Sequence, residues 1–181
     1  MKPFREFLPK DILLPFFGDK PVVGVEIGVL NGECSDALLR AMPRLKLYSV
    51  DPWLYQPGRG YEADDSEQTQ DFKYKFTQFA LKEYGKRSII VREKSVDAAK
   101  TITEPLDFVF IDGDHNEDTV REDILAWKDK LKPRSILAGH DWILQTPSSG
   151  YQHIQKAVRD LLGEPLLGDD NIWYFKHELQ D

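Results

Sequence analysis

Cysteine is almost absent from this chain of 181 residues, which contains only Cys34. A single thiol cannot form a disulfide within the chain or build a cysteine-ligated zinc site. We therefore expect a protein of the reducing cytoplasm. Internal repeats and low-complexity segments are also absent, and 41% of the residues are hydrophobic and 30% charged. This composition predicts one globular domain that spans residues 1–181.

Long apolar runs and an excess of basic residues are missing as well. The first residues, MKPFREFLPKDILLPFF, interrupt their apolar positions with charges and prolines, so we expect neither a signal peptide nor a membrane span there. The net charge of -7 argues against binding to nucleic acids and anionic membranes, which require clustered lysine and arginine. A small molecule is the expected partner, and a homo-oligomer remains open.

The chain also lacks the dinucleotide-binding motif G-x-G-x-x-G. Residues 22–35 contain a glycine turn with a different spacing. They read VVGVEIGVLNGECS: a valine-rich run typical of a buried strand, then Glu26, Gly28 and Gly32, then a helical segment. A pyrophosphate needs the third glycine, and Glu26 would repel it. The turn therefore favours a ligand with a cationic group, although two glycines can also form a plain tight turn.

Apolar runs and helical patterns alternate along the chain, which predicts an α/β fold with a parallel sheet and helices on both faces. The tail, EPLLGDDNIWYFKHE, predicts an antiparallel hairpin at one edge. Residues 1–18 form a lid or a packing arm, and 54–70 form a variable loop. The expected strands are 22–27, 46–50, 88–92, 106–111 and 135–139. The expected apolar helix positions are Phe72, Phe76, Phe79 and Ala80; then Val120, Ile124, Trp127 and Leu131; then Ile154, Ala157, Val158 and Leu161.

Acidic and polar residues follow several predicted strands, at the edge where open α/β sheets bind ligands. Asp51 comes 23 residues after Gly28 and can accept both hydroxyls of a ribose, or it can simply start a turn with Pro52. Ser95 follows the third strand, where it can serve as a helix N-cap.

Two dense clusters of ionisable residues end neighbouring strands. IDGDH, residues 111–115, contains Asp112, Asp114 and His115, and GHDW, residues 139–142, contains His140 and Asp141. Consecutive strands in such folds usually lie side by side, so the clusters should face each other. Crowded carboxylates repel one another without a cation. The pattern therefore predicts a metal site, an acid/base site or both, against the alternative of solvated acids with no role.

Five segments resemble the small class I S-adenosylmethionine-dependent O-methyltransferases, in the subgroup of macrocin-type sugar enzymes and, more distantly, catechol enzymes. They are VEIGVLNGECS, YSVDPW, VREKSVDAA, LDFVFIDGDH and ILAGHDW. The resemblance implies a Rossmann-like, mostly parallel seven-stranded sheet that binds S-adenosylmethionine, with Ser95 beside the adenine. The implied cofactor-binding residues are Glu26, Gly28, Gly32, Ser35, Asp51, Ser95 and Asp112.

The resemblance also implies a divalent cation, with magnesium and manganese as the candidates. Its ligands would be Asp112, His140 and Asp141, although the family usually has an acid where His140 stands, and imidazole suits manganese, iron or zinc better than magnesium. The general base would be Asp114 or His115. We favour His115, because imidazole ordinarily titrates near neutral pH.

The resulting hypothesis is methyl transfer from S-adenosylmethionine to a hydroxyl of a small-molecule acceptor, assisted by a divalent metal. An NAD(P)-linked oxidoreductase is the first alternative, and the missing G-x-G-x-x-G and Y-x-x-x-K patterns count against it. A non-catalytic S-adenosylmethionine-binding protein is the second. The two intact ionisable clusters argue against that alternative, because a site that only binds has no need of a base.

Overall fold

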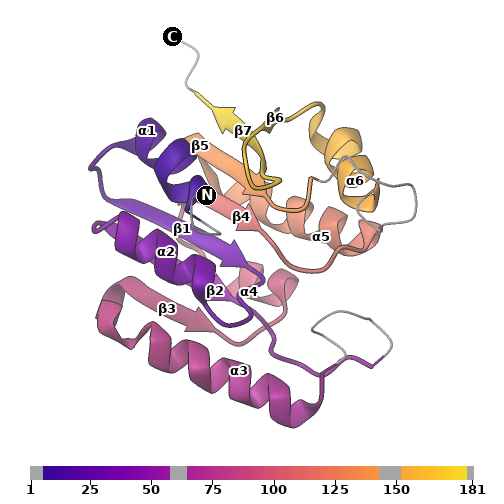
Figure 1. Ribbon diagram of the computed structural model, residues 1–181. Helices are drawn as coiled ribbons and strands as arrows, with labels where there is room; N and C mark the ends of the chain where they lie inside the picture. The colour runs from indigo at the N-terminus through magenta and orange to yellow at the C-terminus, as the bar shows by residue number, and fades with distance from the viewer. Residues whose placement is uncertain (1–5, 58–64, 143–151, 179–181) are drawn as a thin grey trace.

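The protein folds around a seven-stranded sheet, seen in Figure 1. This computed structural model describes residues 6–57, 65–142 and 152–178. The strand order is β3-β2-β1-β4-β5-β7-β6. β1 to β5 pair in parallel, and β7 pairs antiparallel with β5 and with β6. The predicted fold is therefore confirmed. The strands are β1 Val22–Ile27, β2 Leu45–Val50, β3 Ser88–Val91, β4 Leu106–Ile111, β5 Leu131–Gly139, β6 Leu166–Leu167 and β7 Trp173–His177.

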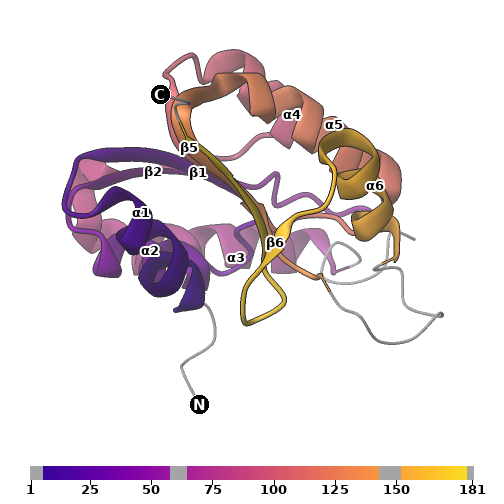
Figure 2. The same ribbon diagram turned by 90° about the horizontal axis from the view of Figure 1, so that it is seen from above.

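Helices cover both faces of the sheet, as Figure 2 shows from above. One face carries α1, α2 and α3, and the other carries α4, α5 and α6. Their bounds are α1 Leu14–Phe17, α2 Glu33–Ala41, α3 Glu67–Ala80, α4 Ser95–Thr101, α5 Glu117–Trp127 and α6 Gln152–Leu162. A π-helical segment, Leu8–Leu13, precedes α1, and short 3-10 segments follow α3 at Lys82–Arg87 and α5 at Lys128–Lys130.

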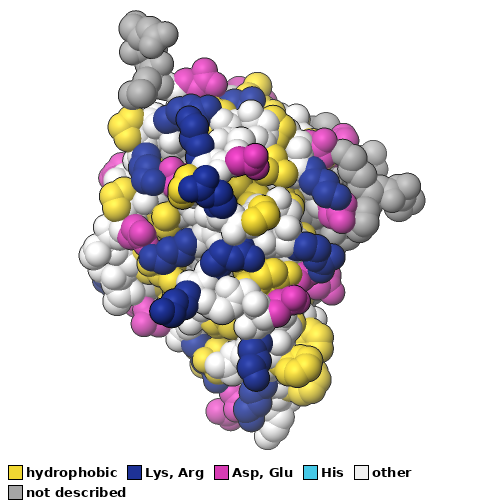
Figure 3. All heavy atoms as spheres, turned by 90° about the vertical axis from the view of Figure 1, so that its left-hand side faces the viewer, with side chains coloured by type: hydrophobic (Ala, Val, Ile, Leu, Met, Phe, Trp, Pro, Cys, Tyr) yellow, Lys and Arg dark blue, Asp and Glu magenta, His cyan; other side chains and the backbone are white. Residues whose placement is uncertain are grey.

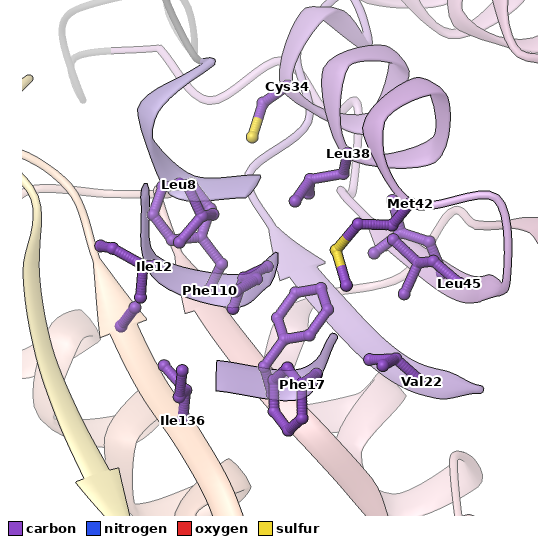
Figure 4. Packing of buried hydrophobic residues seen from close by; sticks show 14 of the residues in the cluster. Leu8, Ile12, Phe17, Val22, Cys34, Leu38, Met42, Leu45, Phe110 and Ile136 are labelled. Atoms are coloured by element: carbon purple, nitrogen blue, oxygen red, sulfur yellow. The ribbon is translucent and has the colours of Figure 1, made fainter. Parts of the chain in front are cut away.

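The central strand β4 is buried on both sides, as its apolar sequence LDFVFI predicts. Phe108 and Phe110 pack into the core cluster beneath α1 and α2, while Val109 and Ile111 pack into the cluster beneath α5. The N-terminal segment belongs to the first cluster (Figure 4). Leu13 is completely buried in it, so this segment is a packing arm. Within the described ranges, no helix is long and apolar enough to cross a membrane.

The prediction for α3 was wrong in its orientation. Phe72, Phe76 and Phe79, the expected apolar face, are exposed, and the side that α3 buries consists of Gln70, Lys73 and Thr77. The N-cap is Ser66, whose hydroxyl accepts a hydrogen bond from the Thr69 backbone N–H at 3.2 Å.

The end of α5 also differs from its predicted position. The helix ends at Trp127, and Leu131, the expected last apolar position, begins β5. Pro133 disfavours helical backbone in the residue before it and lies in the strand, so the chain is extended here. Tyr61 and Tyr151 are loop aromatics whose sequence positions suit either a substrate pocket or ordinary loop anchoring, and both lie outside the described residues.

Candidate functional site

The turn after β1 lies directly against the turn after β4. Gly28 has a φ of +86°, and a Cβ at this position would come within 2.1 Å of the Asp112 carbonyl oxygen. Only glycine fits that conformation and that contact. The Asp112 backbone N–H also donates to the Ile27 carbonyl at 2.8 Å. The predicted glycine therefore serves first to bring the β1 turn and Asp112 together.

Glu26 and Ser35 form a buried polar group beneath this turn. Glu26 is completely buried, and its Oε2 accepts a hydrogen bond from the Ser35 hydroxyl. The Ser35 and Ser49 hydroxyl oxygens lie 2.8 Å apart. This group joins β1, α2 and β2. The structure thus places Glu26 beneath the β1 turn. Gly32, at φ +81°, is the N-cap of α2 and allows the turn to enter the helix.

Asp51 connects the ends of β1 and β2. Its Oδ2 accepts the backbone N–H groups of Val29 at 2.9 Å and Leu30 at 3.0 Å, and its Oδ1 accepts that of Trp53 at 2.7 Å. A carboxylate offers about four acceptor positions. These three bonds therefore leave room for a ribose hydroxyl, and Asp51 is only half-buried.

Trp53 and Thr77 hold the β1 turn, a role that our sequence reasoning did not assign to either residue. The Leu30 carbonyl accepts hydrogen bonds from the Trp53 indole N–H at 2.8 Å and from the Thr77 hydroxyl at 3.1 Å. Leu30 and Trp53 both have positive φ, at 54° and 40°. Such backbone is costly for these residue types and persists where the surroundings hold it. The sequence carries no signal for it, since neither residue is a usual choice for left-handed backbone.

Ser95 does not face the ionisable cluster. It is the first residue of α4, where the N-cap is Lys94, and its hydroxyl accepts the Trp127 indole N–H at 2.8 Å. It also hydrogen-bonds Asp123, a residue of α5 that is 3% exposed. The expected N-cap bond is absent from this described helix start. Ser95 instead joins α4 to α5.

Four of the predicted residues converge at the ends of β4 and β5. His115 Nε2 lies 2.7 Å from Asp141 Oδ2. His140 Nδ1 lies 3.2 Å from Asp141 Oδ1 and 3.4 Å from Asp112 Oδ1. They line a small pocket that is closed by apolar side chains from neighbouring elements. Those side chains are Ile111, Val120, Ile154 and Trp173.

Asp141 is the electrostatic centre of this cluster. Burial raises the pKa of its carboxyl, but hydrogen bonds from His115 and then from His140 outweigh burial and hold the pKa well below its usual range. Asp141 therefore stays ionised and can orient both imidazoles. Its φ of +63° is tolerated by aspartate better than by most residues.

Asp114 lines the same pocket, and its carboxylate bonds to groups at the start of α5. Its Oδ1 accepts the Asn116 backbone N–H at 2.9 Å, and its Oδ2 lies 3.4 Å from the Thr119 hydroxyl oxygen. Asp114 is exposed at the turn that begins α5. Of the two predicted bases, His115 is partly buried and lies 2.7 Å from Asp141, whereas Asp114 is exposed.

The three predicted metal ligands have a suitable arrangement. One ligand atom each from Asp112, His140 and Asp141 lies within 4.8 Å of the others. One imidazole and two carboxylates form a donor set that suits manganese, iron or zinc, and carboxylate oxygens also suit magnesium. The residues present therefore fit a divalent ion.

A family model described as a methyltransferase domain matches residues 25–142, more than half of the chain. The chain therefore belongs to this methyltransferase family. This match spans the Gly28 turn, Asp51 and both ionisable clusters. The resemblance to class I S-adenosylmethionine-dependent methyltransferases is therefore confirmed. A search of curated protein sequences finds no match.

Solved structures of methyltransferases share this fold. An O-methyltransferase from Bacillus cereus in complex with S-adenosylhomocysteine aligns with a TM-score of 0.63 and 17% identity over 94% of this chain and 79% of its own. The O-methyltransferase TomG from Streptomyces achromogenes, in complex with S-adenosylmethionine, aligns with a TM-score of 0.63 and 16% identity. The alignment covers 98% of this chain and 81% of TomG. The calicheamicin methyltransferase CalS11 aligns with a TM-score of 0.67 and 15% identity. The alignment covers 94% of this chain and 78% of CalS11.

The buried Asp123 predicts a pH-dependent stability. Burial raises the pKa of its carboxyl to about 7, while the Ser95 hydrogen bond opposes the shift. An aspartate in the unfolded chain titrates near pH ~3.9. Between these values the native state holds a proton that the unfolded state has lost, so stability should fall as the pH rises from about 4 to about 7.

We expect Asp123→Asn to remove this fall, which should be on the order of 4 kcal/mol for a difference of about three pKa units. Urea unfolding at a series of pH values, followed by tryptophan fluorescence, measures it. Asp118→Asn, at an exposed acid in the first turn of the same helix, is the control. If the free energy of unfolding of the wild type rises over this pH interval and runs parallel to that of Asp123→Asn, Asp123 does not have a raised pKa in the folded protein.

Proposed function

We propose that this protein transfers a methyl group from S-adenosylmethionine to a hydroxyl of a small-molecule acceptor, with His115 as the general base. The observation that carries the proposal is the His115–Asp141 contact of 2.7 Å beside Asp112. Because Asp112 touches the Gly28 turn, this contact adjoins the turn that would hold the cofactor. A base placed there can take the proton of an acceptor hydroxyl as the methyl bond forms.

The cofactor would lie over the β1 turn and Asp51. Asp51 fixes the backbone of Val29, Leu30 and Trp53 and retains acceptor capacity for ribose hydroxyls. Gly28 lets the chain pass without a side chain above Asp112. When bound, S-adenosylmethionine supplies an electrophilic methyl group. The protein's contribution is to hold donor and acceptor in line.

His115 fits the role of base better than Asp114. Asp141 stays ionised and holds one imidazole nitrogen of His115, which fixes the orientation of the ring. The positive charge that His115 gains with the proton would then lie beside a carboxylate. Asp114, by contrast, is engaged by the Asn116 backbone and is exposed.

Asp112, His140 and Asp141 would hold a divalent ion in this site. Such an ion, when bound, orients acceptor oxygens and lowers the pKa of a hydroxyl that reaches it. The donor set supports this part of the proposal, and the family match and the His115–Asp141 pair support methyl transfer independently of it.

Calorimetry with S-adenosylhomocysteine and with NADH tests the cofactor. We expect the first to bind and the second not to bind. Asp51→Asn should weaken S-adenosylhomocysteine binding by about 1.5–3 kcal/mol, because a charge-assisted acceptor is lost. The matched control is Asp107→Asn. Asp107 also accepts a backbone N–H, that of Val23 at 2.7 Å. It lies near the start of β4, however, at the amino ends of the parallel strands and away from the proposed site. Binding of NADH alone would favour the oxidoreductase alternative.

Variants of the two predicted bases test the chemistry. A screen of catechol and sugar hydroxyls would first identify an acceptor that the wild type methylates. We expect His115→Ala to lower kcat about 10²-fold or more, the usual scale for a general base, while the affinity for S-adenosylhomocysteine is unchanged. Asp114→Ala should keep most of the activity. His153→Ala, at an exposed histidine of α6, is the control. If Asp114→Ala is inactive and His115→Ala retains its activity, Asp114 and not His115 is the general base.

Thermal unfolding with added metal ions tests the metal site. We expect manganese to raise Tm by roughly 5–10 °C at a concentration of roughly 100 times its Kd. Asp112→Asn should abolish this shift. Asp118→Asn, at an exposed acid in the first turn of α5, should retain it. If magnesium, manganese and zinc all leave Tm unchanged and a chelator leaves activity unchanged, His115 and Asp141 act without a metal.

A further inference from the structure

We propose that the exposed aromatic face of α3 binds the same face of a second copy of this chain, with the two helices antiparallel across a twofold axis. This aromatic face is formed by Phe72, Phe76 and Phe79. The proposal rests on the exposure of these side chains, on the contacts that fix the orientation of α3, and on the charges at its two ends. It does not depend on the proposed function.

The three phenylalanines are far more exposed than aromatic side chains usually are. Their relative exposures are 67% for Phe72, 46% for Phe76 and 78% for Phe79. The rings of Phe72 and Phe76 stack with centroids 6.3 Å apart. Hydrophobic side chains gather at the lower end of the molecule in Figure 3, the end at which α3 lies in Figure 1. Single exposed apolar residues are common, whereas a contiguous group on one helix face marks an interaction site.

The buried side of α3 shows why the helix cannot turn these rings inward. Thr77 is completely buried and donates to the Leu30 carbonyl at 3.1 Å. Lys73 is also buried, and its ammonium group lies 2.5 Å from the Asp65 carboxylate. These polar contacts fix the rotation of α3 about its axis. Rotating the phenylalanines into the molecule would break the contact that supports the β1 turn.

The spacing of the aromatic face matches an antiparallel copy of itself. Positions 72, 76 and 79 lie on one side of a helix and span about 10 Å along its axis. In an antiparallel pair with the axis near residues 75 and 76, Phe72 of each copy lies level with Phe79 of the other. Phe76 then lies close to its own equivalent. A twofold contact of this kind is self-complementary and closes at two copies.

The charges along α3 favour the same arrangement. The helix begins with Glu67, and the segment after its other end carries one acid, Glu83, and three basic residues, Lys82, Lys86 and Arg87, so that end is net positive. In the antiparallel pair, Glu67 lies level with the lysine-bearing end of the other copy. A parallel pair would instead bring like charges together at both ends. Opposite charges set the direction of pairing more than its strength.

The area available indicates a weak, concentration-dependent dimer. A phenylalanine side chain can bury about 150–250 Å², so the exposed parts of the three rings offer on the order of 400 Å² per copy. A standard interface buries about 800 Å² per partner. Exposed neighbours on the same side, Gln68 and Lys75, add polar contact around the rings. The sum reaches the low end of specific interfaces.

Sedimentation velocity over a series of protein concentrations tests the dimer. We expect the wild-type chain to dimerise, and Phe72→Ser with Phe79→Ser to raise the dissociation constant about 10-fold or more, since buried aromatic anchors dominate such interfaces. Leu125→Ser is the matched control, because Leu125 is 49% exposed on α5. A wild type that stays monomeric, or a dimer that Phe72→Ser with Phe79→Ser leaves intact, would overturn the proposal and leave this face to a different protein.

Disulfide trapping tests the register without weakening the interface first. The only native cysteine, Cys34, is 3% exposed and gives little background. We expect Phe76→Cys to form a disulfide-linked dimer under mild oxidation much faster than Leu125→Cys. Gln68→Cys and Glu83→Cys should link when mixed, and each should link poorly alone. Equal rates for Phe76→Cys and Leu125→Cys would overturn the proposed face, and self-linking of Gln68→Cys would overturn the antiparallel direction.

Discussion

The close approach between Gly28 and the Asp112 carbonyl is the constraint on which the site depends. It joins the turn after β1 to the turn after β4 with no space for a Cβ between them. Asp112 is thereby fixed beside the β1 turn, and the parallel pairing of β4 with β5 brings His140 and Asp141 next to it. One glycine contact thus determines how far the proposed cofactor region lies from the ionisable cluster.

The β1 turn is held from a second direction by α3. The Leu30 carbonyl accepts hydrogen bonds from both Trp53 and Thr77, and the positive φ angles of Leu30 and Trp53 show that this arrangement is imposed on the backbone. A helix that must present Thr77 inward presents its phenylalanines outward. The shape of the turn and the exposed aromatic face therefore share one cause.

The sequence allowed the sheet, its polarity and the convergence of Asp112, His115, His140 and Asp141 to be predicted, because strand alternation and strand ends follow from local pattern. The sequence led to a wrong prediction of which face of α3 is buried. Periodicity separates an apolar face from a polar face, but it does not show which of them packs against the sheet. The sequence could not reveal that Ser95 bonds Trp127 across two helices. Nor could it reveal that Asp51 holds three backbone N–H groups, because each of these contacts depends on tertiary packing.

Asp141 must satisfy two demands in the proposed mechanism. Its Oδ2 holds His115, and its Oδ1 faces His140, so the same carboxylate would orient the base and bind the ion. A carboxylate can do both, since outer hydrogen bonds commonly orient metal ligands. The base and the ion would then be coupled through one side chain: a change in the ion's hold on Asp141 would also change the orientation of His115. In this proposal, the imidazole of His140 would matter beyond its own ligand role, because it contacts the carboxylate on which both functions would depend.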